Sequence, residues 1–243
     1  MKYRIMTVIG VLIFSFAFSN ASEIDNSKDT VIESEPVEEV ELTSEEKTLA
    51  LYKSFSLKNS TMPELSVFEK AIKGYQKLDE AGKVRNSLLT VVDFDLSSTK
   101  KRMWILNMDT EEVEYNTYVA HGKNTGAEFA TKFSNTVNSL QSSLGIYVTG
   151  ETYFGKNGLS LFIDGMEKKF NSNARKRYVV IHGADYAEPQ FIDRLGRLGR
   201  SYGCPAVPNT VAKDLIHKIK GKSVVYIHRS NDKYLETSTF LNS

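Results

Sequence analysis

Two short segments of the chain join a chemically reactive side chain to a glycine. Gly203 precedes Cys204, the single cysteine among 243 residues, and Gly183 follows His182 at the end of an apolar run. An imidazole that accepts the thiol proton turns cysteine into a nucleophile, and a flanking glycine leaves backbone N–H groups free to face an oxyanion. The segments therefore predict thiol-based acyl transfer through a thiolate–imidazolium pair. The alternative is structural, with Cys204 as a small buried hydrophobic residue and His182 as a hydrogen-bonded core histidine.

The four histidines show no metal-binding pattern. No two of them are four residues apart, and the chain lacks the second cysteine that a Cys-x-x-Cys zinc motif requires. We therefore expect neither a metal nor another cofactor. His217 falls on a predicted helix and His228 at the end of a predicted strand, so both are interpreted as structural residues.

The first 21 residues have the pattern of a secretory signal peptide. Lys2 and Arg4 precede an apolar run of 14 residues, Ile5–Phe18, and small residues stand at the −3 and −1 positions of a cleavage site after Ala21. The run is shorter than the ~20 residues that a membrane-spanning helix needs, so a retained anchor is the less favoured alternative. We expect an exported protein, periplasmic or associated with the cell envelope, that is not stably inserted in the membrane after signal cleavage.

A change of composition separates the signal from two predicted helices. Residues 22–47 contain ten acidic residues and few apolar ones, which is typical of a disordered acidic linker. Apolar residues then recur at helical spacing in Glu45–Leu57 and Pro63–Leu78. Residues 48–87 are therefore predicted to pack on the main domain as an N-terminal helical appendage.

From residue 88 onward the apolar pattern is that of β-strands. Short runs rich in β-branched and aromatic residues alternate with turns, and one helix is expected at Thr210–Lys220, after Cys204. These features predict a mainly β (α+β) fold, a β-sandwich or open barrel, over residues 88–230, with a C-terminal tail at 231–243. The predicted strands are Leu88–Asp95, Arg102–Met108, Val113–Ala120, Gly145–Thr149, Gly158–Ile163, Tyr178–His182 and Ser223–His228.

Charge and composition narrow the range of partners. The chain is 41% hydrophobic and 25% charged, which excludes collagen-like, wholly disordered and polytopic membrane proteins. Residues 48–243 hold 27 basic and 20 acidic residues, and this surplus of positive charge favours an anionic partner. The basic residues are too dispersed to indicate nucleic acid, which we do not expect as a partner.

The segment from about Leu88 to Ile227 resembles the catalytic domains of murein L,D-transpeptidases. The resemblance is carried by the His-Gly pair at 182–183 and by the run Ser-Tyr-Gly-Cys at 201–204, which Pro-Ala-Val follows. Two upstream runs, at 121–126 and 134–145, also fit a branch of this family. The resemblance implies an L,D-transpeptidase-like, β-rich fold and a two-step acyl transfer from a peptidoglycan stem peptide to an amine acceptor.

The resemblance also implies roles for individual residues. Cys204 is the expected nucleophile and His182 its base, with the imidazole ring oriented by the backbone carbonyl of Gly183. The N–H groups of Gly203 and Cys204 are expected to form much of the oxyanion hole. Ser201 matches a Ser or Thr of the family that shapes the loop by hydrogen bonding.

The sequence departs from the family pattern beside the thiol. Tyr202 and Ala206 stand where many members have His and Arg or Asn. The contact to a substrate carboxylate could therefore come from elsewhere, and the nearby candidates are Arg200, Lys123 and Arg177. The segment Asp185–Arg200 is slightly longer than in most members and is predicted to act as a lid. His121 can line the substrate pocket, but the sequence is equally compatible with a purely structural role in the turn before Gly122. The predicted substrate-binding residues are Ser201, Tyr202, Arg200, His121 and Lys123, with Arg177 as a further candidate for the carboxylate.

Two other functions are compatible with the sequence. The same thiol with water as the acceptor would give an L,D-carboxypeptidase or endopeptidase, and only the access of the acceptor separates these from a transpeptidase. A non-catalytic cell-wall-binding module would keep the fold without the reaction. The presence of both Cys204 and His182 argues against the binding module, because binding alone requires neither.

Overall fold

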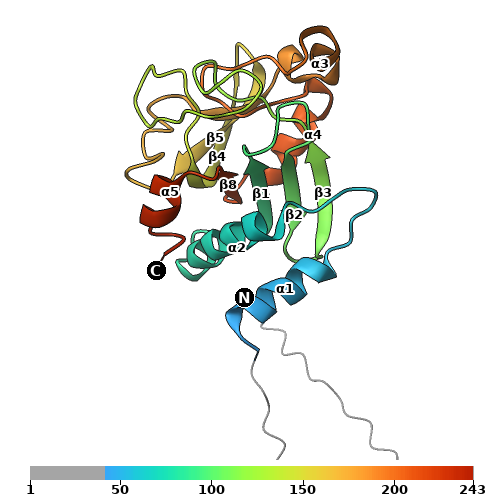
Figure 1. Cartoon of the computed structure of the whole chain (residues 1–243), viewed down its shortest axis with the longest axis vertical. Coiled ribbons are helices and arrows are strands. Elements are labelled where there is room, and N and C mark those ends of the chain that lie inside the picture. Colours follow the sequence, from blue (N-terminus) through green and yellow to red (C-terminus); the bar gives the residue numbers. More distant parts are fainter. Residues whose placement is uncertain (1–41, 243) are drawn as a thin grey trace, which may run out of the picture. The chain divides into compact units, whose positions relative to one another are not determined.

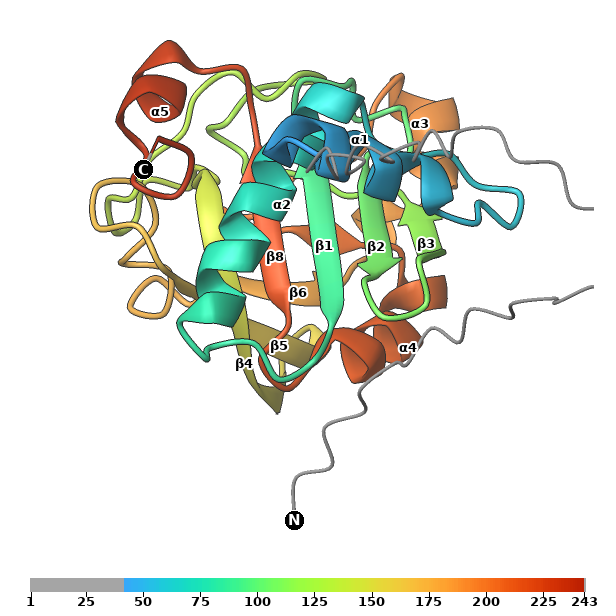
Figure 2. The same cartoon turned by 90° about the horizontal axis from the view of Figure 1, so that it is seen from below.

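The computed structural model describes residues 42–242, and the predicted signal peptide and the acidic residues 22–41 lie outside the described residues. Eight strands form one sheet in the order β3-β2-β1-β8-β4-β5-β6-β7 (Figures 1 and 2). The β1–β8 and β6–β7 pairs are parallel and the others are antiparallel. The expected mainly β fold with helical additions is thus confirmed. The strands are β1 (Leu88–Asp93), β2 (Met103–Asn107), β3 (Glu112–Thr117), β4 (Gly145–Gly155), β5 (Gly158–Gly165), β6 (Val180–Gly183), β7 (Ala206–Val207) and β8 (Val224–His228).

The middle of the sheet is buried on both faces. Every residue of β1 and of β8 is buried. Helix α2 (Leu65–Glu80) packs against these two strands, and α4 (Asn209–Ile219) packs against β5 and β6 (Figure 2). Side chains on both faces of β1 and β8 therefore need to be apolar, which explains why these strands carry nearly continuous apolar runs instead of alternating ones.

The long elements match the sequence predictions, and the short ones were not foreseen. Seven strands and three helices, α1 (Ser44–Ser54), α2 and α4, lie where the patterns place them. The chain also forms a 3-10 turn at Asp185–Ala187, α3 (Pro189–Leu195), α5 (Asp232–Thr237) and the two-residue strand β7. Helices of one or two turns are too short to repeat an apolar period, so periodicity could not reveal them.

The start of α1 corrects the predicted end of the acidic linker. The helix begins at Ser44, so residues 44–47 are helical. Thr43 Oγ1 accepts a hydrogen bond from the Glu46 N–H at 3.2 Å, and the Glu46 carboxylate accepts one from the Thr43 N–H at 2.8 Å. In this capping box the acidic residues satisfy helix N–H groups, so the same negative charge that suggested a linker stabilises the start of a helix.

The C-terminal segment corrects a second boundary. Tyr234 of α5 is fully buried, its hydroxyl donates to Glu167 at 3.1 Å, and its ring packs edge-on against Phe170 with 4.9 Å between ring centroids. Residues 231–242 therefore pack into the domain, and the expected tail is not separate from it.

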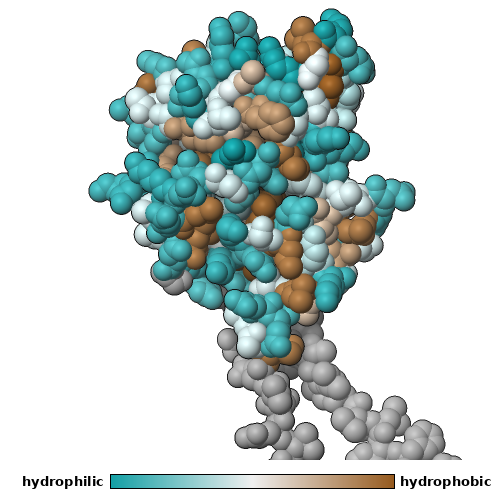
Figure 3. Space-filling model, in the orientation of Figure 1, coloured by the Kyte–Doolittle hydropathy of each residue, from teal (hydrophilic) through white to brown (hydrophobic). Residues whose placement is uncertain are grey.

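The surface of the described residues is mixed in polarity. On the face drawn in Figure 3, apolar residues are scattered among hydrophilic ones. No helix between residues 42 and 242 is both long and apolar enough to cross a bilayer. Two aromatic side chains near His182 and Cys204 in the sequence are well exposed, Tyr178 at 67% and Tyr202 at 76%.

Candidate active site

One edge of the sheet brings His182 and Cys204 together from distant parts of the sequence. His182 is in β6, and the parallel register of β6 and β7 pairs it with Ala206. Cys204 lies two residues before Ala206, in the loop that leads into β7. The parallel pairing of two short strands is therefore the feature that positions the thiol and the imidazole at the same edge.

The ring of His182 is held in one tautomer. Nδ1 lies 2.8 Å from the carbonyl oxygen of Gly183, and because a carbonyl oxygen only accepts, Nδ1 carries a hydrogen, so the neutral ring has its lone pair on Nε2. A Cβ at position 183 would lie 2.3 Å from Asn209 Oδ1, so the close packing here requires glycine. Burial lowers the pKa of His182, and the hydrogen bond to Gly183 offsets part of this effect. At neutral pH the ring is a neutral base with a free Nε2.

The Cys204 thiol is partly exposed and contacts the main chain that leads into β6. Its S–H donates to the carbonyl oxygen of Tyr178 at 3.4 Å. Burial raises the pKa of the thiol, while a hydrogen bond with the Val180 main chain and the charge of Arg177 oppose the rise. The resting site therefore combines a neutral thiol with a neutral imidazole. Both pKa shifts run opposite to those that a preformed thiolate–imidazolium pair would show, and that pair stays a prediction.

Tyr178 presents its carbonyl to the thiol from an uncommon backbone conformation. Its φ angle is +53°, in the left-handed region that non-glycine residues seldom adopt. Such a conformation costs about 1–3 kcal/mol and persists where surrounding structure enforces it. The ring packs against Phe162 with 5.9 Å between centroids but stays largely exposed, so burial of the ring does not explain the conformation.

Gly203 lets the loop of residues 201–204, here called the thiol loop, pack against a neighbouring segment. Its φ angle is +121°, and a Cβ would lie 2.8 Å from the carbonyl oxygen of Gln141. Ser201 then closes the loop on itself, because its hydroxyl accepts from the Gly203 N–H at 3.0 Å and donates to the Cys204 carbonyl oxygen at 2.6 Å. The loop that carries the thiol is thus fixed by its own residues.

The hydrogen bonds of this loop involve one of the two N–H groups that are predicted to form the oxyanion hole. The Gly203 N–H is already bound to the Ser201 hydroxyl, so it is not available to a substrate oxygen. The Cys204 N–H has no hydrogen-bond acceptor between residues 42 and 242, and it stays a candidate donor. Ser201 itself is buried and uses its hydroxyl inside the loop, which supports a shaping role over direct substrate binding.

His121 is buried with both ring nitrogens engaged. Arg102 donates to Nδ1 at 2.8 Å, so Nε2 carries the hydrogen and donates to the Gly126 carbonyl oxygen at 3.3 Å. Burial, followed by the charge of Arg102, lowers the pKa of His121 to about 3. No ring nitrogen is left for a ligand. The structure therefore supports the structural alternative for His121 over the expected role in substrate binding.

The other residues predicted to bind substrate lie in two paired loops. The Lys123 N–H donates to the Ser201 carbonyl oxygen at 2.7 Å. Arg200 donates to the carbonyl oxygens of Lys123 at 3.4 Å and Gly126 at 3.2 Å, so part of its guanidinium holds these loops together. The side chains of Lys123 and Tyr202 are exposed beside the thiol loop, where a substrate can reach them.

Arg177 joins the thiol loop to residues 134–145, here called the serine-rich run. Its guanidinium donates to the Ser134 carbonyl oxygen at 2.7 Å, to the Ser143 hydroxyl at 2.6 Å and to the Gln141 carbonyl oxygen. Its charge also acts on Cys204 in the sense that lowers the thiol pKa. From the sequence, Arg177 was a candidate ligand for a substrate carboxylate. Its contacts instead make it a positioning residue.

Tyr186 is a neighbour of the thiol that sequence reasoning missed. It is half-buried in the turn at Asp185–Ala187, and its carbonyl oxygen accepts from the Gly199 N–H at 2.7 Å. Burial raises the pKa of Tyr186, and the charges of Cys204 and Tyr202 add to the rise. No local pattern marks this tyrosine, because its neighbours come from another loop.

One group of metal-ligand residue types occurs between residues 42 and 242. Ligand atoms of Asp93, Asp95 and His228 lie within 4.8 Å of one another. Asp95 also accepts from Arg229 at 2.8 Å and from the Ser230 hydroxyl at 2.6 Å, and these partners balance its charge. We interpret the group as structural. Motif spacing could not find it, because its members meet across the parallel strands β1 and β8.

In comparisons with known proteins, the chain matches the model of one protein family. Residues 59–228 match the family model described as the L,D-transpeptidase catalytic domain, and no curated protein matches the chain significantly. Among solved structures, an L,D-transpeptidase from Mycobacterium smegmatis is 12% identical over 59% of this chain and 59% of that chain, with a TM-score of 0.37. A mutant L,D-transpeptidase from Enterococcus faecium is 16% identical over 60% of this chain and 50% of that chain, with a TM-score of 0.35. L,D-transpeptidase 3 from Mycobacterium tuberculosis is 9% identical over 59% of this chain and 61% of that chain, with a TM-score of 0.38. The chain thus spans half to about three fifths of the length of these structures.

Proposed function

The chain belongs to the L,D-transpeptidase catalytic domain family, and on that premise we propose that it transfers peptidoglycan stem peptides to an amine acceptor through a thioester on Cys204. The observation that supports this most directly is the tautomer of His182. Its Nδ1–H is bound to Gly183, so a basic Nε2 is available at the edge of the sheet that leads to the thiol. A neutral imidazole is the form that a general base requires.

Acylation begins with attack of the Cys204 sulfur on the carbonyl carbon of the amide that follows the third stem residue. His182 Nε2 accepts the thiol proton as the C–S bond forms, and the carbonyl oxygen becomes negatively charged. The Cys204 N–H is the candidate donor to this oxygen. The C–N bond then breaks, the imidazolium returns the proton to the leaving amine, and a thioester remains.

Deacylation uses the same two groups in reverse order. The acceptor amine attacks the thioester carbon while His182 Nε2 removes a proton from the nitrogen. A new C–N bond forms, the C–S bond breaks, and the sulfur recovers its proton from the imidazolium. Water in place of the amine would release the free acid, which is the hydrolytic alternative.

We also propose that this reaction takes place outside the cytoplasm, in the periplasm or at the cell envelope. The support is the signal-peptide pattern of residues 1–21, with its cationic start, apolar run and small residues before the expected cleavage site. Peptidoglycan stem peptides are available to an enzyme in that compartment.

The test is an analysis of products by mass. The purified protein is incubated with tetrapeptide-stem muropeptides, alone and with an added amine acceptor. We expect a cross-linked or amine-substituted product, a transient adduct on Cys204, and neither of them with Cys204→Ala. Hydrolysed tripeptide stems without any amine product would identify the hydrolase alternative. Binding of muropeptides with no adduct and no product would identify a wall-binding module and contradict the proposal.

A further inference from the structure

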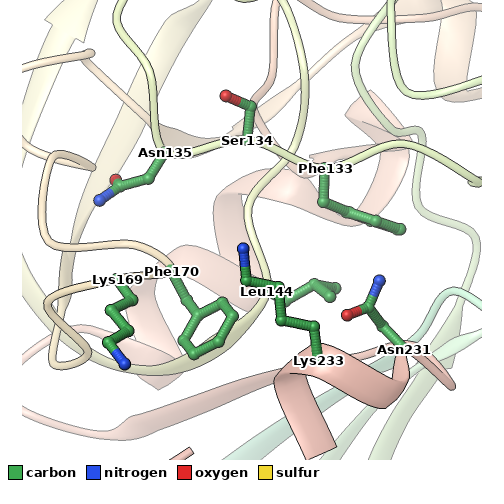
Figure 4. Close-up of a pocket in the computed structure, with 8 residues that line it drawn as sticks. All are labelled: Phe133, Ser134, Asn135, Leu144, Lys169, Phe170, Asn231 and Lys233. Atoms are coloured by element: carbon green, nitrogen blue, oxygen red, sulfur yellow. The ribbon is translucent and has the colours of Figure 1, made fainter. Parts of the chain in front are cut away.

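A cavity outside the candidate active site lies between residues 133–144, the turn after β5 and α5 (Figure 4). Its volume is about 430 Å³, within the range of about 300–1,000 Å³ that small-molecule sites occupy. No residue that lines it belongs to β6 or to the thiol loop. Eight residues line it, three apolar and five polar: Phe133, Leu144 and Phe170, and Ser134, Asn135, Lys169, Asn231 and Lys233.

The polar part of this cavity offers donors and positive charge. Neither Lys169 nor Lys233 forms a salt bridge with any carboxylate of residues 42–242. Asn231 Oδ1 is used to cap α5, where it accepts from the Tyr234 N–H at 3.0 Å, so the amide NH₂ is left as a donor. In Figure 4 the Lys233 side chain extends from α5 into the space between Phe170 and Phe133. The chemical complement of this arrangement is an anion on an aliphatic stem.

A buried carboxylate outside the candidate active site holds the walls of the cavity in place. Glu167 accepts from the Ile146 N–H at 2.8 Å, from the Tyr234 hydroxyl at 3.1 Å and from the Ser238 hydroxyl. It thereby ties the start of β4, the turn after β5 and α5 to one another. Glu167 forms no salt bridge with Lys169 or Lys233. The cavity is thus preformed, which lowers the entropic cost of binding.

One side chain connects this cavity with the thiol loop. Ser134 lines the cavity, and its carbonyl oxygen accepts from Arg177 at 2.7 Å. The same guanidinium donates to the carbonyl oxygen of Gln141, against which Gly203 packs. A ligand in the cavity therefore sits on the segment that also supports the loop of Cys204.

We propose that this cavity, here called the Lys233 pocket, binds a carboxylate group of a peptidoglycan stem peptide, a proposal that rests on the proposed function. Lys233 and the Asn231 amide donate to the carboxylate, and Lys169 adds positive charge at the rim. Phe133, Leu144 and Phe170 pack against the aliphatic chain that carries it. The pocket fits a carboxylate on an apolar stem better than a phosphate of a hydrated polymer, because half of its wall is hydrocarbon.

The test measures binding in the full chain with Cys204→Ala, so that no turnover occurs. The probe is a tetrapeptide stem with free carboxylates, titrated by calorimetry. We expect Lys233→Gln to weaken binding roughly tenfold, as the loss of one charge-assisted hydrogen bond does. Asn231→Asp keeps the cap oxygen for Tyr234 but adds negative charge, so it should weaken binding more while preserving the melting temperature. Lys168→Gln is the matched control, because Lys168 is exposed next to the pocket without lining it.

Two further arms identify the anion. A stem with amidated carboxylates should bind as weakly as the Lys233→Gln variant binds the acid form. Glycerol phosphate should compete poorly, and competition as strong as that of the stem would assign the pocket to polymer phosphate and overturn the proposal. Equal affinity of the Lys233→Gln variant and its parent would also overturn it.

The outcomes separate this proposal from the proposed function. Formation of product by the intact thiol enzyme, with stem binding that ignores Lys233 and Asn231, would refute the pocket and leave the transpeptidase proposal standing. Binding that depends on Lys233, without any product or adduct, would support the pocket and refute the transpeptidase proposal. In the chain that keeps its thiol, Lys233→Gln should leave the alkylation rate of Cys204 unchanged, because Lys233 is not part of the reacting group.

Discussion

The Cys204 thiol donates its hydrogen bond to the carbonyl oxygen of Tyr178, at 3.4 Å. A carbonyl oxygen cannot donate, so this contact stabilises the protonated thiol and is lost when the sulfur becomes a thiolate. The neutral tautomer of His182 agrees with this protonation state. In the proposed reaction the proton would then leave sulfur during attack on substrate, instead of being lost to His182 beforehand.

The first prediction concerns the titration of Cys204. Because burial raises the pKa of the thiol, its alkylation by iodoacetamide should increase with pH through a pKa above the ordinary value of about 8.5. The same measurement on the denatured chain should return the ordinary value. A pKa below 8.5 in the folded protein would restore the thiolate–imidazolium pair that the sequence suggested and contradict the neutral resting state.

The second prediction concerns His182 as the base. His182→Ala should lower kcat by about 10²–10⁴-fold, because positioned general acid–base catalysis contributes that much. His182→Gln should be nearly as damaging, because an amide can bind Gly183 but cannot move a proton. His217→Gln is the control, since His217 is exposed on α4, and it should change kcat less than about twofold. A His182→Gln enzyme with near-normal kcat would remove His182 from the mechanism.

Local sequence patterns predicted most of the fold, because long elements repeat their pattern. β8 has the run Val-Val-Tyr-Ile-His, and α4 repeats apolar residues at helical spacing over 11 residues. β7 has only two residues, and α5 only six, so neither contains a repeat. Their positions depend on contacts made far along the chain, such as the burial of Tyr234 beside Glu167.

In the candidate site, too, some features could be predicted from local sequence and others depend on distant contacts. The Cys204 and His182 pair could be recognised from residue types next to glycine, and Gly183 orients the ring as the resemblance implies. The hydrogen bond from the Gly203 N–H to the Ser201 hydroxyl could not be predicted, because it forms only in this conformation of the loop. The sequence suggested Arg177 as a ligand for a substrate carboxylate. Its hydrogen bonds could not be predicted, because they depend on how the serine-rich run folds over it.

The third prediction compares two arginines that are two residues apart. Arg177→Gln removes the charge that favours the Cys204 thiolate and the hydrogen bonds to the serine-rich run, so it should raise the thiol pKa further and lower kcat/KM by at least tenfold. Arg175→Gln breaks surface ion pairs with Glu151 and Asp164, which typically contribute about 0–1 kcal/mol, so its effect should be small. Thiol alkylation against pH and steady-state kinetics measure both effects. Equal kinetics for the two variants would show that Arg177 does not position the loop.

The fourth prediction compares two glycines that both have a positive φ angle. Gly203→Ala places a Cβ 2.8 Å from the carbonyl oxygen of Gln141, so the thiol loop must move and kcat should fall by more than about tenfold. Gly158→Ala also has a positive φ, of +72°, but its Cβ would meet no atom within 4 Å. It should cost only about 1 kcal/mol of stability and leave kcat unchanged. Loss of kcat in both variants to the same degree would indicate a general effect on folding.

The last prediction concerns stability at low pH. His121 is buried between Arg102 and Gly126, and its pKa falls to about 3, so in the folded protein it stays neutral at pH values where the unfolded chain is protonated. Between about pH 6.5 and 3 the unfolded state therefore binds more protons, and the free energy of unfolding decreases as the pH falls. His121 alone contributes up to about 1.4 kcal/mol per pH unit in this window. His228, with a pKa lowered to about 4, acts in the same direction.

Asp93 opposes these histidines, because burial raises its pKa to about 6 and its folded form binds the additional proton below that value. Buried Glu167, whose pKa is also raised, acts with Asp93, whereas His182, Asp95 and Glu114, whose pKa values are lowered, act with His121 and His228. Urea unfolding of the parent protein at pH 7, 5.5 and 4 should therefore still show a net loss of stability on acidification. His121→Gln should lower the free energy of unfolding at pH 7, because the Arg102 contact is weakened, and should make its pH dependence flatter. Asp93→Asn should make the pH dependence steeper. If His121→Gln kept the slope of the parent protein, His121 would titrate normally in the fold, and its burial against Arg102 would not control acid stability.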